Sequence, residues 1–435
     1  MPNKKKLLAI GCGPSNLSLM SLMSGIEQHE AMILERSESF NWHSGMQLPG
    51  AELQVSFLKD LVTLADPTNP LSFLSFLKEN GLLYRTLVSS RVSVSRKMFE
   101  RYYKWAIQKL GNIRFGAEVQ DIALGKDMFQ VLTKNERYSA HNVCIGIGKQ
   151  SYTPAFDDPD RDKNHSSNFA SRMKSDFSRQ MICVIGGGQS AAEIVEFLLN
   201  LTDPPKEIVW VCRRPMLFPL DDSPFVNEIY TPAFAEYFHA LPENARLQLN
   251  RNLRMTSDGI SSSTLDNLYS HFYRNAIERD DGPTLRLKFS TEVKNVKKSP
   301  SGSRKVFTRD TLTDYADTIH CDQIVYATGY QNKLPDFLDG IAPHLTFENS
   351  GEVRLNADFS AHMKVETNAK LFLQNAGVGQ FGLADQNLSL GAWRSSKIVN
   401  AIMGKEHYFI PTDSLAGEYP TDHQQENTHQ KRIEV

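Results

Sequence analysis

The stretch Leu7–Asn16, which reads LLAIGCGPSN, decides how the rest of the chain is interpreted. Its first four residues form a short apolar run, which is typical of a strand buried on both faces of a parallel sheet. Gly11 and Gly13 follow, and an apolar pattern of helical period covers residues 17–26. Strand, glycine turn and helix in this order predict a dinucleotide site, because Gly11 permits a tight turn and Gly13 lets the backbone approach a pyrophosphate. The helix N-terminus adds unpaired N–H groups that favour an anion.

An acidic residue follows at the distance that such a site requires. Ala31–Leu34 predicts the second strand, and Glu35 ends it about 20 residues after the turn, where a carboxylate can hydrogen-bond a ribose. Asn16 stands where a third glycine often stands. The alternative is an ordinary strand–turn–helix with incidental glycines, and the position of Glu35 disfavours it.

The composition is that of a soluble globular protein with two or three domains. The 435 residues are 40% hydrophobic and 23% charged, and the formal net charge is −2, so we expect no nucleic-acid partner and no anionic-membrane partner. No apolar run is long enough to span a bilayer. The N-terminal lysines and the apolar run superficially resemble a signal peptide, but cleavage would destroy the glycine turn, so we expect a cytoplasmic protein.

Cysteine usage indicates a reducing compartment. No CxxC pair occurs, which disfavours a disulfide reductase, and four of the five cysteines lie in or beside predicted strands. We therefore expect no disulfide, no metal site and no catalytic cysteine. The cysteines are Cys12, Cys144, Cys183, Cys212 and Cys321.

The opening pattern returns in the middle of the chain. Met181–Ile185 predicts a strand, and Ala192–Asn200 predicts the helix that follows it. Between them, Gly186, Gly188 and Ala191 fit the pattern GxGxxA, so a second dinucleotide site is predicted.

The next strand of this second unit ends differently from its counterpart. Ile208–Cys212 is followed by Arg213 and Arg214, whereas the first unit has Glu35 at the same place. Two cations at a ribose-binding tip suit a 2′-phosphate, so the second nucleotide is predicted to be NADPH. The alternative is a pair of ordinary surface arginines.

Two nucleotide-binding folds in one chain narrow the chemistry. A first site with an acid and a second with arginines implies a bound flavin that NADPH reduces. We expect an α/β fold with two Rossmann-like domains, for FAD and NADPH, and a helical insertion that forms the substrate region or, alternatively, only a packing block. The expected segments are an FAD domain at 1–153 and 324–410, an NADPH domain at 177–220 and 280–323, the helical region at 221–279 and a mobile tail at 411–435.

Smaller elements are predicted within these segments. Strands are expected at Phe115–Gln120 and Asn142–Ile147, a polar linker at Pro154–Asp176, and a closing helix at Leu388–Met403.

Several longer motifs resemble those of the flavin-dependent N-hydroxylating monooxygenases, which include the lysine and ornithine N-monooxygenases of siderophore biosynthesis. The resemblance covers nearly the whole chain, from about Leu7 to Met403. Its motifs are Gly11-Cys12-Gly13-Pro14-Ser15-Asn16, Trp42-His43-Ser44-Gly45-Met46, Phe57-Leu58-Lys59-Asp60-Leu61, Gly188-Gln189-Ser190-Ala191, Met255-Thr256-Ser257-Asp258-Gly259-Ile260 and Ala327-Thr328-Gly329-Tyr330.

The resemblance implies a cofactor-binding set. Gln54 would lie near both the flavin and the nicotinamide. The residues that would hold FAD are Gly11, Gly13, Pro14, Ser15, Asn16, Glu35, Trp42 and His43. Those that would contact NADPH are Arg96, Gly186, Gly188, Gln189, Ser190 and Arg213, and the motif Thr328-Gly329-Tyr330 is also expected to bind cofactor.

The resemblance also implies a substrate site. Lys59 and Asn227 match positions that hold the carboxylate end of an amino-acid substrate. Ser389, before the closing helix, would lie near flavin and substrate. With Gln54, these three are the candidate catalytic residues.

Two departures from the family pattern bear on the substrate. Ornithine enzymes carry a Thr-Asn pair where this chain has Thr256 and Ser257, as in the lysine enzyme. The family usually has Thr-His-Gly where this chain has Gln380-Phe381-Gly382, which suggests an altered, more apolar pocket. The candidates are therefore lysine, or an amine without a carboxylate such as putrescine, cadaverine or histamine.

In the implied reaction, NADPH reduces FAD, and O2 and a neutral primary amine give a hydroxylamine. A free alkyl amine has a pKa of about 10.4, so burial must favour its neutral form. The alternatives are a Baeyer–Villiger or sulfide-oxidising monooxygenase and a non-catalytic flavin-binding protein, although a mere binder needs no reductant site. A homo-oligomer, dimer or tetramer, is compatible with the resemblance.

Overall fold

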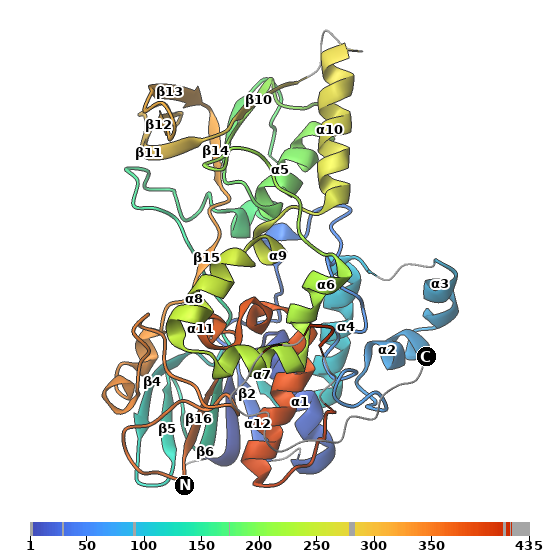
Figure 1. Ribbon diagram of the computed structural model, residues 1–435, viewed down its shortest axis with the longest axis vertical. Coiled ribbons are helices and arrows are strands. Elements are labelled where there is room, and N and C mark those ends of the chain that lie inside the picture. The colour runs from blue at the N-terminus through green and yellow to red at the C-terminus, as the bar shows by residue number, and fades with distance from the viewer. Residues whose placement is uncertain are drawn as a thin grey trace.

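The computed structural model describes residues 3–27, 30–89, 93–173, 175–277, 283–411, 415–417 and 419. Two lobes follow one another along the long axis of the molecule (Figure 1). The lower lobe contains the N-terminal sheet, and the upper lobe contains a second parallel sheet. Nearly all of the predicted tail at 411–435 lies outside the described residues.

A seven-stranded sheet forms the centre of the lower lobe. Strand β1 pairs in parallel with β2 and β6, and β16 pairs in parallel with β6. Strands β4 and β5 extend the sheet in antiparallel fashion. The strands are β1 (Asn3–Ile10), β2 (Ala31–Leu34), β3 (Ile113–Arg114), β4 (Val119–Leu124), β5 (Phe129–Thr133), β6 (Arg137–Ile145) and β16 (Lys370–Leu373).

Burial explains why the first apolar run becomes a central strand. Leu7, Leu8 and Ala9 have no exposed surface, because β1 has a strand on each side and α1 packs beside it with α4 and α12. Helix α4 begins after Ser95, whose hydroxyl accepts from the Met98 N–H at 3.2 Å, and ends at Gly111 in a left-handed conformation. The helices of this part are α1 (Pro14–Glu27), α2 (Phe73–Glu79), α3 (Leu83–Val88), α4 (Arg96–Leu110) and α12 (Gly391–Met403).

The upper lobe repeats the parallel arrangement. Its sheet has the strand order β10-β9-β8-β14, and all three pairings are parallel. The glycine turn at 186–188 joins β8 to α5, as predicted. The elements are β8 (Met181–Ile185), α5 (Gln189–Leu199), β9 (Glu207–Val211), β10 (Thr284–Lys288) and β14 (Gln323–Tyr326).

The predicted helical region between β9 and β10 is helical, and it serves both lobes. Helices α7 and α8 pack against the short α11 (Val378–Phe381) of the lower lobe, whereas α10 packs along α5 of the upper lobe (Figure 1). The helices are α6 (Pro224–Asn227), α7 (Pro232–Ala240), α8 (Glu243–Asn252), α9 (Met255–Asp258) and α10 (Ser262–Ile277). None of the helices that the structure describes combines the length and apolar character needed to traverse a bilayer.

Three features of the fold differ from the sequence predictions: a domain boundary, a strand and a sheet. Strand β14 pairs with β8, so the domain boundary predicted at 323/324 is wrong, and the upper sheet continues to Tyr326. The strand predicted at Phe115–Gln120 is wrong, because Gly116 turns the chain with φ of +68° and the next strand begins at Val119. An antiparallel sheet that was not predicted comprises β11 (Thr291–Lys298), β12 (Arg304–Asp310) and β13 (Ala316–Cys321).

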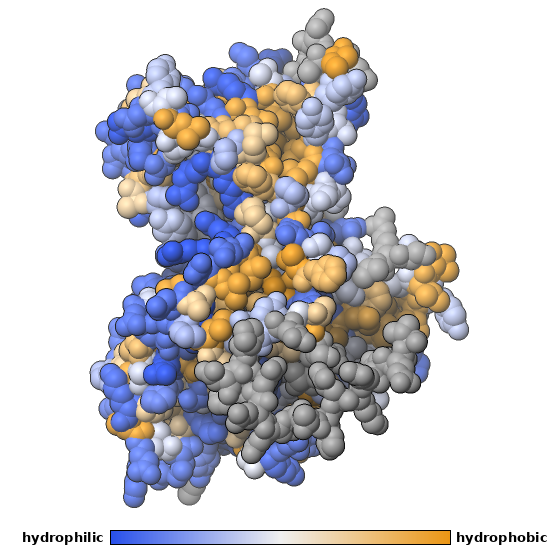
Figure 2. Space-filling view, in the orientation of Figure 1, coloured by the Kyte–Doolittle hydropathy of each residue, from blue (hydrophilic) through white to orange (hydrophobic). Residues whose placement is uncertain are grey.

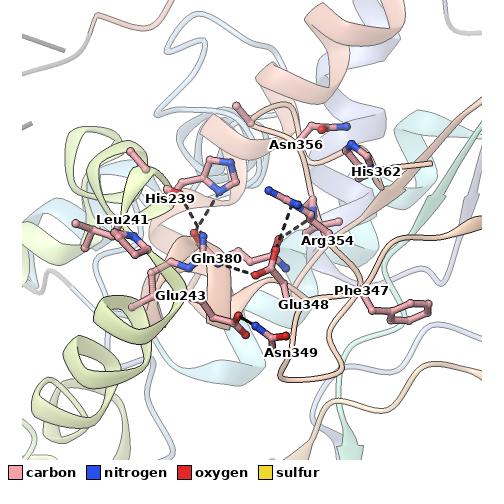
Figure 3. A pocket seen from close by; sticks show the side chains of 15 residues that line it. His239, Leu241, Glu243, Phe347, Glu348, Asn349, Arg354, Asn356, His362 and Gln380 are labelled. Carbon is pink, nitrogen blue, oxygen red and sulfur yellow. Dashed lines mark hydrogen bonds and ion pairs between the residues drawn. The ribbon is translucent and has the colours of Figure 1, made fainter. Parts of the chain in front are cut away.

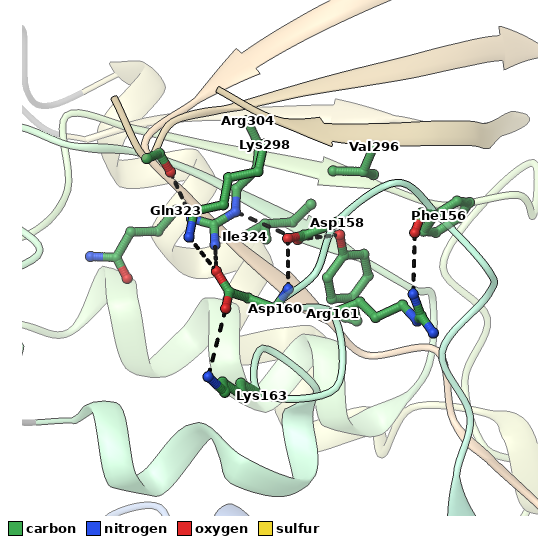
Figure 4. Close-up of polar contacts among 12 residues, drawn as sticks. Phe156, Asp158, Asp160, Arg161, Lys163, Val296, Lys298, Arg304, Gln323 and Ile324 are labelled. Carbon is green, nitrogen blue, oxygen red and sulfur yellow. Dashed lines mark hydrogen bonds and ion pairs between the residues drawn. The ribbon is translucent and has the colours of Figure 1, made fainter. Parts of the chain in front are cut away.

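The segment predicted as a polar linker is fixed to the upper lobe. Asp158 has no exposed surface; its carboxylate accepts from the Tyr326 hydroxyl at 2.8 Å and lies 3.5 Å from the Arg304 guanidinium (Figure 4). Asp160 accepts from Lys298 at 2.6 Å. Short strands β7 (Gln150–Ser151) and β15 (Tyr330–Gln331) then pair with each other between the lobes.

A buried ion pair joins the closing segment to the first glycine turn. The Arg394 guanidinium lies 2.7 Å from the Asp385 carboxylate, and the two side chains are 2% and 1% exposed. Arg394 also donates to Gln374 at 3.2 Å and to Ser15, near the start of α1, at 3.3 Å. Gln374 in turn donates to Asn16 at 2.9 Å. The pair therefore anchors residues 374–394 beneath the turn.

We predict that Arg394→Met destabilises the protein by about 3–5 kcal/mol, because the Asp385 charge would remain buried without its partner. The matched control is Lys397→Met on the same helix, whose partner Glu236 is 43% exposed and whose loss should cost only about 0–1 kcal/mol. Urea unfolding of both variants measures the difference. Equal midpoints for the two variants would show that the buried pair does not anchor this segment.

Candidate functional site

The first glycine turn lies where β1 ends, against the loop that follows β6. Gly11 has φ of +93°, and a Cβ there would lie 2.7 Å from the carbonyl oxygen of Gly146. The Asn16 amide donates to the carbonyl oxygens of Ile10, at 2.9 Å, and Gly11, at 2.8 Å. Asn16 therefore closes the turn with its side chain, and α1 starts at Pro14 with its N–H groups directed toward the same edge of the sheet.

Glu35 lies at the tip of β2 beside this turn. Its carboxylate oxygens accept from the N–H groups of Cys12 and Ser37, each at 2.8 Å. Burial, and secondarily the Glu35 charge, raise the pKa of the Cys12 thiol to about 12. Cys12 is consequently protonated at neutral pH, and the turn presents no reactive thiolate.

Trp42 packs against α4, and His43 lies beside it. The Trp42 ring meets Tyr103 edge-on at 5.0 Å and His43 edge-on at 4.9 Å between centroids. The His43 side chain keeps solvent contact, yet protein atoms surround it closely. This desolvation, followed by the positive charge of Arg96, lowers the pKa of His43 to about 4, so the imidazole is neutral at neutral pH.

Lys59 is directed toward the helical insertion. Its ammonium lies 5.4 Å from the centroid of the Tyr230 ring, and burial lowers the pKa of Lys59 from its ordinary value. The Tyr230 hydroxyl donates to the Thr256 carbonyl at 2.7 Å. The lower lobe and two helical segments of the insertion therefore meet around this cation.

The other three candidate catalytic residues differ in exposure. Gln54 is exposed. Asn227 is also exposed, and its amide donates to the Asp222 carbonyl at 2.7 Å. Ser389 is 3% exposed, and its hydroxyl donates to Asn387 at 2.7 Å. The side chains of Asn227 and Ser389 thus each have a hydrogen-bond partner within the protein.

The second glycine turn is as tightly packed as the first. Gly186 has φ of +134°, and a Cβ there would lie 2.1 Å from the carbonyl oxygen of Ala327. Gly188 precedes α5, and Ser190, in its first turn, is half-buried. The backbone of this turn can therefore approach a pyrophosphate as the first one can.

The two arginines after β9 have different environments. Arg214 donates to the Asp258 carbonyl at 2.9 Å and forms an ion pair with its carboxylate at 3.6 Å. Arg213 is exposed. Of the two arginines, Arg213 is therefore the more exposed, whereas Arg214 is held by Asp258.

Arg96 and Gln189 both bind Glu193 of α5. Arg96 lies 2.6 Å from the Glu193 carboxylate, and Gln189 donates to it at 2.9 Å. At the crossing between the lobes, the Thr328 hydroxyl donates to the Tyr152 carbonyl, and Gly329 accepts from the Tyr152 N–H at 2.9 Å. These contacts join the lobes at the two places where cofactor residues were predicted.

Phe381 does not line an open pocket, which corrects the interpretation of its motif. It is 2% exposed and lies between the His239 ring, 4.4 Å away, and the Phe359 ring, 4.1 Å away. A polar cavity of about 630 Å³ opens on the far side of His239, and its lining includes Arg354 and Glu348 (Figure 3). The aromatic side chain thus fills space in the core and offers no apolar wall to a substrate.

Lys149, directly before β7, is a charged residue near the crossing between the lobes that sequence reasoning missed. It donates to Gln386 and is half-buried, and burial lowers its pKa although Asp258, Asp385 and Glu352 oppose this effect. Its position in the loop that follows β6, near the carboxyl edge of a parallel sheet, was the available signal. Figure 2 shows the waist between the lobes, where polar and apolar side chains meet on this face.

Comparison with known proteins gives consistent matches. A family model described as L-lysine 6-monooxygenase/L-ornithine 5-monooxygenase matches residues 4–332. L-lysine N6-monooxygenase of Escherichia coli is 33% identical over 412 residues, which cover 93% of this chain and 96% of that protein.

Two solved structures resemble the whole fold. The cadaverine monooxygenase DfoA of Erwinia amylovora, from the desferrioxamine biosynthetic pathway and bound to FAD, has a TM-score of 0.90 and 28% identity, and the match covers 96% of this chain and 99% of DfoA. The ornithine N-hydroxylase KtzI of Kutzneria sp. 744, with reduced FAD, NADP+ and L-ornithine, has a TM-score of 0.86 and 29% identity, covering 92% and 99%.

These matches confirm the α/β fold, the enzyme class and the cofactor pair that the resemblance implied, and they do not favour the Baeyer–Villiger, sulfide-oxidising or non-catalytic alternatives. The chain belongs to the L-lysine 6-monooxygenase/L-ornithine 5-monooxygenase family of N-hydroxylating flavoenzymes.

Proposed function

We propose that the first glycine turn binds FAD, that the second binds NADPH, and that the enzyme N-hydroxylates a small primary amine in siderophore biosynthesis. The observation that carries this assignment is the opposite charge at two equivalent strand tips. Glu35 lies beside the first turn, and the exposed Arg213 follows β9 beside the second. A carboxylate suits an unmodified ribose, and a guanidinium suits a 2′-phosphate.

The residues of the lower lobe fit a flavin dinucleotide. Gly11 lies against the Gly146 backbone, so no side chain separates the two main-chain segments at the turn. The start of α1 offers N–H donors to a pyrophosphate. When bound, FAD supplies the reaction with O2, using reducing equivalents from NADPH. The neutral His43 lies edge-on to the ring of Trp42, and in this proposal the two side chains contact the flavin.

The protein must also keep the substrate amine unprotonated. The amine nitrogen attacks only as a free base, and its pKa in water is about 10.4, so it is charged at neutral pH. Removal of water from around an ammonium group favours its neutral form, as the lowered pKa of the protein's own Lys59 illustrates.

We further propose that the preferred substrate lacks a carboxylate. Of the three positions that could hold a carboxylate, Asn227 already donates to Asp222 and Ser257 donates to the Arg254 carbonyl. Lys59 is then the principal donor, and it also contacts the Tyr230 ring. A site in which Asn227 and Ser257 each use a donor within the protein holds a carboxylate weakly, so cadaverine, putrescine or histamine is favoured over lysine, and ornithine is expected to be poorest.

A location in the cytoplasm and a homo-oligomeric state remain predictions within this proposal.

The first prediction concerns the flavin. Gly11→Ala should lose most of its bound FAD, because the new Cβ meets the Gly146 backbone and φ is unfavourable for alanine. The FAD-to-protein absorbance ratio of the purified variant measures this. Gly25→Ala is the control, since α1 leaves its Cβ in open space. Full FAD content in Gly11→Ala would contradict the assignment.

The second prediction concerns the reductant. Arg213→Ala should raise the KM for NADPH by about tenfold or more and leave the KM for NADH nearly unchanged, since one phosphate contact is lost. Steady-state oxidation of both nucleotides measures the effect. Arg309→Ala, an exposed arginine of β12, removes the same charge elsewhere as a control. A wild-type enzyme that uses NADH and NADPH equally refutes the assignment.

The third prediction concerns the substrate. Lysine and cadaverine differ only in the carboxylate, as do ornithine and putrescine. For each pair, the hydroxylamine formed per NADPH consumed therefore measures the effect of the carboxylate on coupling. We expect higher coupling for a carboxylate-free amine and the lowest for ornithine. Lys59→Gln should raise the KM for lysine more than for cadaverine. The highest coupling with ornithine would contradict the proposal.

We also predict that the binding of lysine relative to cadaverine depends on pH. The lowered pKa of Lys59 means that its positive charge is present at low pH and is lost, as pH rises, earlier than in a free lysine. Binding of lysine relative to cadaverine should therefore weaken in the alkaline range in the wild-type enzyme. The Lys59→Gln variant should lack this change; if the change persists there, another group is responsible.

A further inference from the structure

One ion pair joins the two lobes through a planar, bidentate contact. Arg96 is the first residue of α4 in the lower lobe, and Glu193 lies on α5 of the upper lobe. The guanidinium donates through Nη1 to Oε2 at 2.8 Å and through Nη2 to Oε1 at 2.6 Å. The side chains are only 14% and 9% exposed. Such a pair fixes orientation as well as distance, because both groups must be nearly coplanar.

The pair is the centre of a longer chain of hydrogen bonds. Arg96 also donates to the Met46 carbonyl at 3.0 Å, in the segment that follows Trp42 and His43. Glu193 Oε1 accepts from the side-chain amide of Gln189 at 2.9 Å, and the side-chain oxygen of Gln189 accepts from the Ser261 N–H at 2.8 Å. The chain thus runs from Met46, past the second glycine turn, to the start of α10.

Both residues held by Glu193 are expected to contact NADPH. Arg96 lies in one lobe and Gln189 in the other, so a nucleotide that touches both requires the lobes to be correctly placed. The Arg96 guanidinium has further N–H donors that no bond among the described residues uses, which leaves it able to contact an anion while it is held by Glu193.

We propose that Glu193 is a positioning residue for NADPH: its carboxylate holds Arg96 and Gln189, and with them the two lobes, in the arrangement that receives the nucleotide. The inference rests on the proposed NADPH site. Glu193 itself contacts neither the flavin nor the amine in this account, and its effect passes through the residues that it orients. Its removal should therefore slow reduction of the flavin by NADPH without affecting later steps.

The test uses the full-length, FAD-loaded enzyme and its Glu193→Gln variant, which keeps the shape of the side chain and removes its charge. We expect the KM for NADPH to rise by about tenfold and anaerobic flavin reduction by NADPH to slow by about tenfold or more. Reduction by dithionite, which needs no nucleotide site, should keep its wild-type rate. Glu193→Asp, which retains the charge with a shorter reach, should reduce faster than Glu193→Gln.

The matched control is Glu196→Gln, three residues further along α5. Glu196 accepts from Asn267 at 2.8 Å within the upper lobe, away from the Arg96–Glu193 ion pair, so its loss should leave NADPH kinetics unchanged. Wild-type NADPH kinetics in Glu193→Gln would overturn the inference, as would equal slowing of dithionite and NADPH reduction. A wild-type enzyme that does not oxidise NADPH at all would instead refute the proposed function.

Discussion

The structure depends on how closely the first glycine turn approaches the loop after β6. At Gly11 the backbone has φ of +93° and lies against the Gly146 carbonyl, where any Cβ would collide. At Gly146 the constraint is reciprocal, because the Asn16 side chain occupies the space where a Cβ would be, 2.7 Å away. Asn16 then binds Gln374, and Gln374 binds Arg394. One steric constraint is thereby transmitted to the segment that carries Ser389.

In the proposed function, the two lobes use the same kind of turn for different ligands. The charge that follows the second strand distinguishes them, with Glu35 in one and Arg213 in the other. Contacts between the lobes include the β7–β15 pair, the Arg96–Glu193 ion pair, and the side chains of Met46 and Leu48, which pack into the apolar core of the upper lobe. Because the insertion places α7 and α8 on one lobe and α10 on the other, the position of the upper lobe also affects the surroundings of Lys59. In the proposed function, the substrate and reductant sites are therefore mechanically connected.

Sequence patterns predicted the features that local chemistry determines. The two strand–turn–helix units, Glu35 and the arginines after β9 could be identified because each depends on a short stretch of chain. The antiparallel sheet β11–β13 was missed, and so was the membership of β14 in the upper sheet, because strand partners are set by tertiary packing. The pairing of Arg96 with Glu193 could not be predicted, since the residues are far apart in sequence. Phe381 was misread because a substitution in a motif does not reveal which way the side chain packs.

The measurement that tests the central claim most directly follows oxygen from isotopically labelled O2 during NADPH oxidation in the presence of a primary amine. The account predicts that one labelled oxygen atom appears on the nitrogen of cadaverine, putrescine, histamine or lysine, with hydrogen peroxide as a minor product. If NADPH is oxidised and the label appears only in hydrogen peroxide or water for every amine, the protein does not hydroxylate these amines, and the proposed function is wrong.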